Sequence, residues 1–359
     1  MRTVLAATTS LLLALGIASA SHAGPRSEQI LERFENANQW RDHVMVVAHR
    51  GGGLEAGKTL YPENSIASLR GVIALGAEMV EIDIRRSKDG ELIVMHDSWL
   101  DRTTDCKGEV IARTLDELRH CRLVVEGTGA VTGEPVPTLR EMLEAAKGKI
   151  LVNLDNKLET ADLVDMVALA REMGMEEQVV VKANLWNAER VAAVKATMAR
   201  VGQGFQFMPI MADDAVRDPA FVAAAGKAFA ADAVEMITWR GNAEKMTETG
   251  GPLFTAKVRA ASIRGNWHIW VDTHAIVNKP GGFLSGGRGD ELAVAAGFPN
   301  EVFGFWAERG ATMIQTDEPK AAINWLAANG YRVPYAEIDE SVASAVGHAA
   351  SELRELPTN

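Results

Sequence analysis

Polar side chains with catalytic and metal-binding chemistry follow several short apolar runs of this 359-residue sequence. The set comprises two histidines, three carboxylates and two cations: His49, His96, Glu81, Asp83, Asp155, Arg50 and Lys157. Glu81 and Asp83 are two residues apart, so on a strand both carboxylates point to the same face. So many polar groups beside apolar runs predict a functional site.

The chemistry of this set is that of a phosphate-ester hydrolase. Three carboxylates favour one hard divalent cation, Mg²⁺ or Ca²⁺, whereas zinc would recruit more histidine or cysteine. Arg50 and Lys157 can donate charge-assisted hydrogen bonds to an anionic oxygen. Two histidines, one that removes a proton and one that supplies it, suit acid–base catalysis at neutral pH. We therefore expect metal-assisted hydrolysis of a phosphate ester.

Eight short β-branched runs alternate with helical stretches rich in Ala, Leu and Glu. The predicted strands are Met45–Ala48, Val80–Ile84, Ile150–Leu154, Val179–Lys182, Gly204–Met208, Ala233–Ile237, His268–Val271 and Thr312–Gln315. The predicted helices between them include Ser65–Leu75, Ala161–Met173, Ala188–Met198, Pro219–Phe229 and Pro319–Ala328. This alternation predicts an α/β fold, and eight units favour a closed (β/α)8 TIM barrel over a doubly wound open sheet.

The predicted barrel brings the polar set together. Functional groups of such barrels lie at the carboxyl ends of the strands, and each member of the set follows or ends a predicted strand. No Gly-x-Gly-x-x-Gly follows any of these strands, so a dinucleotide-binding fold gains no support.

Two segments interrupt the alternation. Turn residues Ser87–Gly90 send the chain back after the second strand, and residues 97–137 then form a small insertion with weak periodicity. The insertion contains the two cysteines, Cys106 and Cys121. In an exported chain an even, local pair favours a disulfide over two buried thiols. The glycine-rich segment Asn278–Gly297 is either a lid over the barrel mouth or a tolerated surface loop.

The two ends of the chain are expected to lie outside the barrel. Residues 1–23 combine a basic Arg2, an apolar stretch and a small-x-small pattern, which predicts a signal peptide cleaved after Ala23 rather than a membrane anchor. We therefore expect a periplasmic or secreted protein with no stable membrane anchor. Residues 24–44 are predicted as an N-terminal helical segment, 45–330 as the barrel and 331–359 as a C-terminal tail.

The net charge argues against a nucleic-acid partner. The chain has 37 basic and 48 acidic residues, which gives −11 at neutral pH. A surface this acidic repels a phosphate backbone. An anionic small molecule must therefore be attracted by local cations.

Several spaced motifs together resemble the glycerophosphodiester phosphodiesterase family. They are Ala48-His49-Arg50-Gly51-Gly52, Tyr61-Pro62-Glu63-Asn64-Ser65, Gly76-Ala77, Glu81-Ile82-Asp83, Asp89-Gly90, His96-Asp97, Asp101-Arg102-Thr103, Pro137-Thr138-Leu139, Ile269-Trp270-Val271, Gly310-Ala311 and Thr316-Asp317-Glu318-Pro319. The resemblance extends over residues 45–330. It is most specific over residues 48–104, where many spaced matches coincide.

The resemblance implies hydrolysis of a glycerophosphodiester to glycerol 3-phosphate and an alcohol, on a (β/α)8 barrel with an insertion after the second strand. The roles it implies are acid–base catalysis for His49 and His96, binding of one divalent metal for Glu81, Asp83 and Asp155, and phosphate contact for Arg50 and Lys157. The chain departs from the family pattern at two places. The third metal ligand is usually Glu rather than Asp155, and Val271-Asp272-Thr273 follows Trp270 in place of Thr-Val-Asn.

Two other functions fit the same residues. One is a phospholipase of the C or D type that acts on an intact lipid. The other is a non-catalytic phosphodiester-binding protein, although binding alone does not require two histidines that transfer protons. In each case the expected partner is a small-molecule phosphodiester.

Overall fold

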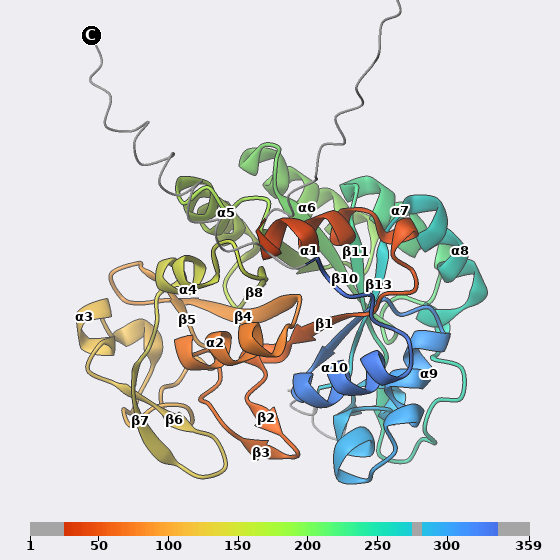
Figure 1. Cartoon of the computed structure of the whole chain (residues 1–359). Helices are drawn as coiled ribbons and strands as arrows, with labels where there is room; N and C mark the ends of the chain where they lie inside the picture. Colours follow the sequence, from red (N-terminus) through yellow and green to blue (C-terminus); the bar gives the residue numbers. More distant parts are fainter. Residues whose placement is uncertain (1–24, 275–281, 337–359) are drawn as a thin grey trace, which may run out of the picture. The chain divides into compact units, whose positions relative to one another are not determined.

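The computed structural model describes residues 25–274 and 282–336 of the chain. The predicted signal peptide, most of the predicted tail and the first residues of Asn278–Gly297 lie outside the described residues. Pro25–Tyr335 form one unit, in which parallel strands close into a barrel surrounded by helices (Figure 1).

Eight parallel strands form the barrel. In order around it they are β1 (Met45–Ala48), β4 (Met79–Arg86), β8 (Leu151–Asn156), β9 (Val179–Asn184), β10 (Gln206–Ala212), β11 (Ala233–Ile237), β13 (His268–Asp272) and β15 (Met313–Thr316). The sheet closes because β1 pairs in parallel with both β4 and β15. The predicted (β/α)8 barrel is therefore confirmed, with all eight strands near their predicted positions.

Several strands continue beyond their predicted carboxyl ends. β8 reaches Asn156 and β9 reaches Asn184, because these polar residues still pair with Ile84 and Ile210 of the neighbouring strands. β10 begins and ends later than predicted, at Gln206 and Ala212. Polar residues thus belong to the strands and are held by their hydrogen bonds at the barrel mouth.

Helices cover the outside of the barrel. They are α2 (Ile66–Leu75), α4 (Leu139–Ala146), α5 (Leu163–Glu172), α6 (Ala188–Val201), α7 (Pro219–Phe229), α8 (Ala256–Gly265), α9 (Phe303–Glu308) and α10 (Pro319–Ala328). Both α7 and α10 start at a proline, whose fixed φ suits the first helical position. Among the described residues, no helix is both long and apolar enough to cross a membrane.

The barrel interior changes from apolar to polar along the strands. At the amino-terminal end a buried cluster includes Ile30 and Phe34 of α1 (Arg26–Glu35), Met79 and Leu151. Inward-facing side chains recur every second residue, so Glu81 and Asn153 form the next layer above Met79 and Leu151. The apolar layer closes the barrel below, and the polar layer opens towards the mouth.

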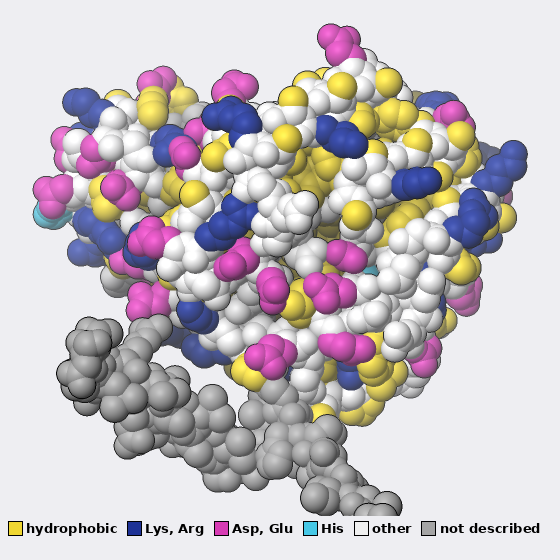
Figure 2. Space-filling model, turned by 90° about the horizontal axis from the view of Figure 1, so that it is seen from above, with side chains coloured by type: hydrophobic (Ala, Val, Ile, Leu, Met, Phe, Trp, Pro, Cys, Tyr) yellow, Lys and Arg dark blue, Asp and Glu magenta, His cyan; other side chains and the backbone are white. Residues whose placement is uncertain are grey.

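Figure 2 shows the molecule from the side of α1. Acidic and basic side chains are interspersed there with hydrophobic ones, and no broad basic area covers this face.

The insertion after β4 has a small core of its own. β5 (Leu92–Val94) runs antiparallel to β4, so the chain reverses at Ser87–Gly90 as predicted. The insertion then contains α3 (Leu115–Leu118) and a hairpin of β6 (Arg122–Val125) with β7 (Ala130–Pro135). Its buried apolar residues form a cluster separate from the barrel core.

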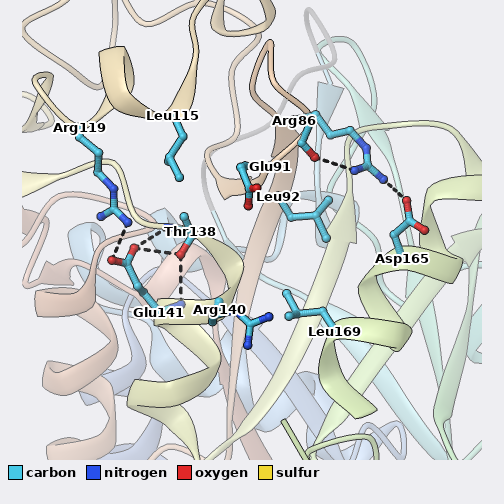
Figure 3. A pocket seen from close by; sticks show the side chains of 11 residues that line it. Arg86, Glu91, Leu92, Leu115, Arg119, Thr138, Arg140, Glu141, Asp165 and Leu169 are labelled. Carbon is cyan, nitrogen blue, oxygen red and sulfur yellow. Dashed lines mark hydrogen bonds and ion pairs between the residues drawn. The ribbon is translucent and has the colours of Figure 1, made fainter. Parts of the chain in front are cut away.

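An ion pair and a helix cap connect the insertion to the barrel (Figure 3). Arg119, just after α3, contacts the carboxylate of Glu141 on α4 at 2.7 Å. The same carboxylate accepts the backbone N–H of Thr138, and the Thr138 hydroxyl accepts the backbone N–H of Glu141, which together form a capping box. A pocket between the insertion, α4 and α5 surrounds these contacts and does not contain the polar set.

Two short hairpins and the end of the described chain complete the fold. β2 (Leu54–Glu55) pairs with β3 (Lys58–Thr59), and β12 (Arg240–Gly241) pairs with β14 (Gly282–Phe283). Arg332, in the segment predicted as a tail, binds the buried Glu78 at 2.7 Å. Contacts of the barrel thus continue past residue 330.

The predicted disulfide joins Cys106 to Cys121. Replacing both cysteines by alanine should lower the free energy of unfolding by about 3 kcal/mol, because the 15-residue loop gains freedom in the unfolded chain. Urea denaturation checks this value, and wild-type protein treated with reductant is the control. Equal stability of the double variant and the oxidised wild type would contradict it.

Candidate active site

Two histidines at the mouth each bind a carboxylate through Nδ1. His49 begins the turn after β1, and its Nδ1 lies 2.8 Å from Oδ1 of Asp317, which follows β15. His96 follows β5, and its Nδ1 lies 2.7 Å from Oδ1 of Asp97. Each carboxylate accepts a hydrogen bond from Nδ1–H. Nε2 is therefore the nitrogen that can exchange a proton with a substrate. This arrangement suits acid–base catalysis.

Glu81, Asp83 and Asp155, here called the carboxylate triad, come together on adjacent strands. Each offers an oxygen within 4.8 Å of the others. Asp83 on β4 pairs in register with Asp155 on β8, and Glu81 shares the inward face of β4. The Asn64 side chain fixes Asp83 by donating to Oδ2 at 2.8 Å and accepting the Asp83 N–H at 3.1 Å.

The two predicted phosphate-binding cations contact the triad. Nζ of Lys157 lies 3.1 Å from Oδ1 of Asp83 and 2.5 Å from Oδ2 of Asp155. Nε of Arg50 lies 3.4 Å from Oδ2 of Asp83. The Arg50 backbone has a positive φ of 50°, and its N–H donates to Oε2 of Glu81 at 3.0 Å. Both cations are therefore within reach of an anion that approaches the triad.

Burial and mutual repulsion oppose three negative charges in the triad. Burial and the charge of Asp83 raise the pKa of Glu81 to about 8. Burial also favours neutral Asp83, but Lys157 and Arg50 outweigh it and hold the pKa of Asp83 below its ordinary value. At neutral pH Glu81 therefore keeps a proton while Asp83 is ionised.

The triad fits the divalent cation that its residue types predict. Its donors are oxygens only, which Mg²⁺ and Ca²⁺ prefer. A divalent ion would replace the proton on Glu81 and compensate the buried carboxylates, whose charge is costly without a partner.

Burial favours the neutral form of both histidines. Burial lowers the pKa of His49 well below its ordinary value, and Arg50 and Lys157 lower it further, against the opposing effect of Asp83. Burial also lowers the pKa of His96. The charge of Asp83 acts on both rings, which places both histidines within the electrostatic reach of the triad.

A chain of ion pairs joins Arg50 to His96. Glu63 accepts from Arg50 at 3.1 Å and from Arg102 at 2.6 Å. Arg102 in turn binds Asp97 at 2.7 Å, and Asp97 holds His96. Glu63, Asp97 and Arg102 each lie in a motif of the family resemblance, and these motifs are the signal in the sequence that points to them.

A third histidine stacks on His49. The ring centroids of His49 and His274 are 3.7 Å apart, and the ring planes differ by 15°. With Asp317 these rings offer a second group of donors within 4.8 Å. Parallel stacked rings direct their nitrogen lone pairs along separate planes, so one ion would not lie in the plane of both. The geometry assigns this cluster to the positioning of His49 rather than to a metal.

The comparisons with known proteins identify relatives of this chain. The model of the glycerophosphoryl diester phosphodiesterase family matches residues 49–218. The matched segment, residues 49–218, belongs to this family. A glycerophosphodiester phosphodiesterase of Caldanaerobacter subterraneus subsp. tengcongensis is 34% identical over 143 residues, which are 38% of this chain and 57% of that relative. The chain spans less than two thirds of the length of the curated relatives that it matches.

Solved structures of the glycerophosphoryl diester phosphodiesterase family share the fold. One from Parabacteroides distasonis has a TM-score of 0.59 and 19% identity. The matched region includes 88% of this chain and 95% of the Parabacteroides distasonis chain. A phosphodiesterase of Oleispira antarctica, in complex with the product sn-glycerol-3-phosphate, has a TM-score of 0.50 and 19% identity, and covers 79% of this chain and 96% of its own.

The family segment contains every site residue that the sequence predicts. His274 and Asp317, in contrast, lie beyond residue 218. The environment of His49 therefore comes in part from residues outside the matched segment.

Proposed function

We propose that the chain hydrolyses glycerophosphodiesters to glycerol 3-phosphate and an alcohol. In this proposal the carboxylate triad holds one divalent ion, Mg²⁺ or Ca²⁺, and two histidines transfer protons. The observation that carries the proposal is the pairing of His49 and His96, each bound at Nδ1 by a carboxylate, with a buried triad of carboxylates in one barrel mouth. The product named for the Oleispira antarctica phosphodiesterase, sn-glycerol-3-phosphate, supports the choice of substrate.

The reaction proceeds in two displacements at phosphorus. One histidine takes the proton of the glycerol 2-hydroxyl at its Nε2, the hydroxyl oxygen bonds to phosphorus, and the bond from phosphorus to the alcohol oxygen breaks. The second histidine protonates that oxygen. Water then opens the cyclic phosphate with the two histidines in exchanged roles, which leaves glycerol 3-phosphate.

The environments of the two histidines indicate which one acts as the base and which one as the acid in the first displacement. His49 has the more strongly lowered pKa, because of burial and the cations Arg50 and Lys157, so it is neutral and serves as the base. His96, whose pKa is lowered less and whose ring is bound by Asp97, enters this step protonated and supplies its Nε2 proton to the departing oxygen. The bound ion withdraws electron density from the phosphoryl oxygens. Arg50 and Lys157 move part of their contacts from the triad to these oxygens, where negative charge accumulates.

Turnover of glycerophosphocholine tests the proposal directly. Protein supplied with Mg²⁺ or Ca²⁺ should release glycerol 3-phosphate, measured by a coupled enzymatic assay. A chelator should stop the release, and added metal should restore it. Failure to hydrolyse any glycerophosphodiester with metal present would reject the proposal. Release of headgroup from intact phospholipid vesicles alone would identify a phospholipase instead.

The disulfide supports a further part of the proposal, that the chain acts outside the reducing cytoplasm. Disulfides such as Cys106–Cys121 persist in oxidising compartments. Fractionation of the cells that express the full chain, followed by sequencing of the mature amino terminus, tests the predicted cleavage after Ala23.

A further inference from the structure

The partner of His49 belongs to a buried pair of carboxyl groups. Asp317 binds Nδ1 of His49 at 2.8 Å and is almost fully buried. Asp290 lies beside it and is 3% exposed. Its Oδ2 accepts the backbone N–H of Asp317 at 2.8 Å and the hydroxyl of Thr316 at 2.9 Å. Asp290 thus holds the segment that presents Asp317 to the histidine.

Asp290 is itself held by the barrel. Its backbone N–H donates to the carbonyl oxygen of Thr273, just after β13, at 2.8 Å. The residue therefore bridges the carboxyl ends of β13 and β15, the two strands whose extensions carry His274 and Asp317. Any displacement of Asp290 would move both groups that contact His49.

Burial disfavours a negative charge on both carboxyl groups of this pair. Burial and the neighbouring charge of Asp317 raise the pKa of Asp290 well above its ordinary value. Oδ1 of Asp290 makes no hydrogen bond among the described residues. A neutral carboxyl group with its proton on Oδ1 meets both observations, since Oδ2 remains the acceptor. Asp317 then carries the charge that faces His49.

We propose that Asp290 and Asp317 form a buried carboxyl pair that positions His49, in which Asp317 binds the imidazole and Asp290 holds Asp317. The proposal rests on the proposed function, in which His49 transfers a proton. When the substrate hydroxyl gives its proton to Nε2, the Nδ1 proton remains in place and the ring becomes an imidazolium. The charge of Asp317 stabilises that cation. His274, stacked on the ring, restricts its rotation.

The carboxylate that binds His96 has a different neighbour from the carboxylate that binds His49. Its carboxylate partner, Asp97, is bound by the cation Arg102, which neutralises part of its charge. Asp317 has a neutral acid, Asp290, in the corresponding place, so its charge acts on His49 with less compensation. The two histidines thus have carboxylate partners with different neighbours, a buried acid for Asp317 and a cation for Asp97.

Substitutions that separate shape from charge test the pair. Asp317→Asn should lower kcat about 10²- to 10⁴-fold, because the amide stabilises neither the Nδ1–H tautomer nor the imidazolium. Asp290→Asn should retain kcat within about threefold, since an amide oxygen accepts the same two hydrogen bonds. Asp290→Ala should lower kcat at least about tenfold, because Asp317 loses its support. KM should change little in all three variants.

A readout independent of activity accompanies the kinetics. ¹⁵N chemical shifts of the labelled imidazoles should show the Nδ1–H tautomer of His49 in the wild type and in Asp290→Asn, and a mixture of tautomers in Asp317→Asn and Asp290→Ala. Asp232→Asn is the matched control. Burial raises the pKa of Asp232 to about 7, but it precedes β11 at the opposite end of the barrel, and its replacement should alter neither readout.

The outcomes are distinguishable from failure of the proposed function. If the wild type hydrolyses no glycerophosphodiester, the tautomer of His49 still tests the pair. An unchanged tautomer in Asp317→Asn or Asp290→Ala would overturn the proposal. Equal loss of kcat in Asp290→Asn and Asp290→Ala, with both variants folded, would overturn the assignment of a neutral Asp290.

Discussion

Replacement of His49 or His96 by alanine is expected to lower the turnover of glycerophosphocholine by about 10²- to 10⁴-fold. Each ring supplies or removes one proton in a step that water performs poorly. Neither histidine belongs to the carboxylate triad that binds the metal in this proposal. The affinity for Mg²⁺, measured by calorimetry, should therefore remain close to that of the wild type. Loss of turnover without loss of metal binding is the result that identifies proton transfer as the missing function.

The histidine at position 120 provides a matched control for these substitutions. It is exposed in the insertion. Within the described part of the chain, its ring forms one hydrogen bond, with the backbone oxygen of Asp116. His120→Ala should therefore keep the wild-type rate. Near-normal turnover in His49→Ala or His96→Ala would contradict the role proposed for that histidine. A rise in turnover with added imidazole would locate the defect at the proton transfer.

The barrel and the triad could be predicted because their signals are local. Each strand is a short run such as Met45–Ala48 or Ala233–Ile237, and β-branched residues in such runs fit a buried parallel sheet. Glu81 and Asp83 share a face by their spacing alone. The rule that barrel strands present functional groups at their carboxyl ends then adds Asp155 from the next strand.

The residues that position His49 could not be predicted, because they are distant from it in the sequence. His49 and Asp317 are 268 residues apart, and only closure of the barrel between β1 and β15 makes them neighbours. Asp290 lies in a loop whose path no periodicity determines. Glu63 binds Arg50, and the neighbouring Ser65 caps α2.

Glu81→Gln and Asp83→Asn should both abolish metal binding but should differ in their effect on the stability of the metal-free fold. Glu81 is protonated at neutral pH, so glutamine resembles the state already present, and the free energy of unfolding with chelator should change by less than about 1 kcal/mol. Asp83 is ionised and compensates Lys157 and Arg50. Its replacement leaves both cations with one partner fewer and should cost about 3 kcal/mol.

The pH dependence provides an independent check on Glu81. Because its pKa is about 8 in the folded chain and 4.5 as a model value, the native state binds the extra proton between these values. Stability of the metal-free wild type should therefore fall as pH rises through this range, and Glu81→Gln should remove this contribution. Metal competes with the same proton, so the Mg²⁺ affinity of the wild type should rise with pH and level off above about 8.

Urea denaturation with chelator and with Mg²⁺ measures both effects of these substitutions. Glu126→Gln is the matched control, since burial and Glu63 raise the pKa of Glu126 to about 7 but it lies outside the triad. It should keep the stabilisation by Mg²⁺ that the two triad variants lose. If Glu81→Gln retained that stabilisation, Glu81 would not be a ligand. If it destabilised the metal-free chain as strongly as Asp83→Asn, Glu81 would be ionised without metal, and the cations Lys157 and Arg50 would be compensating all three carboxylates of the triad.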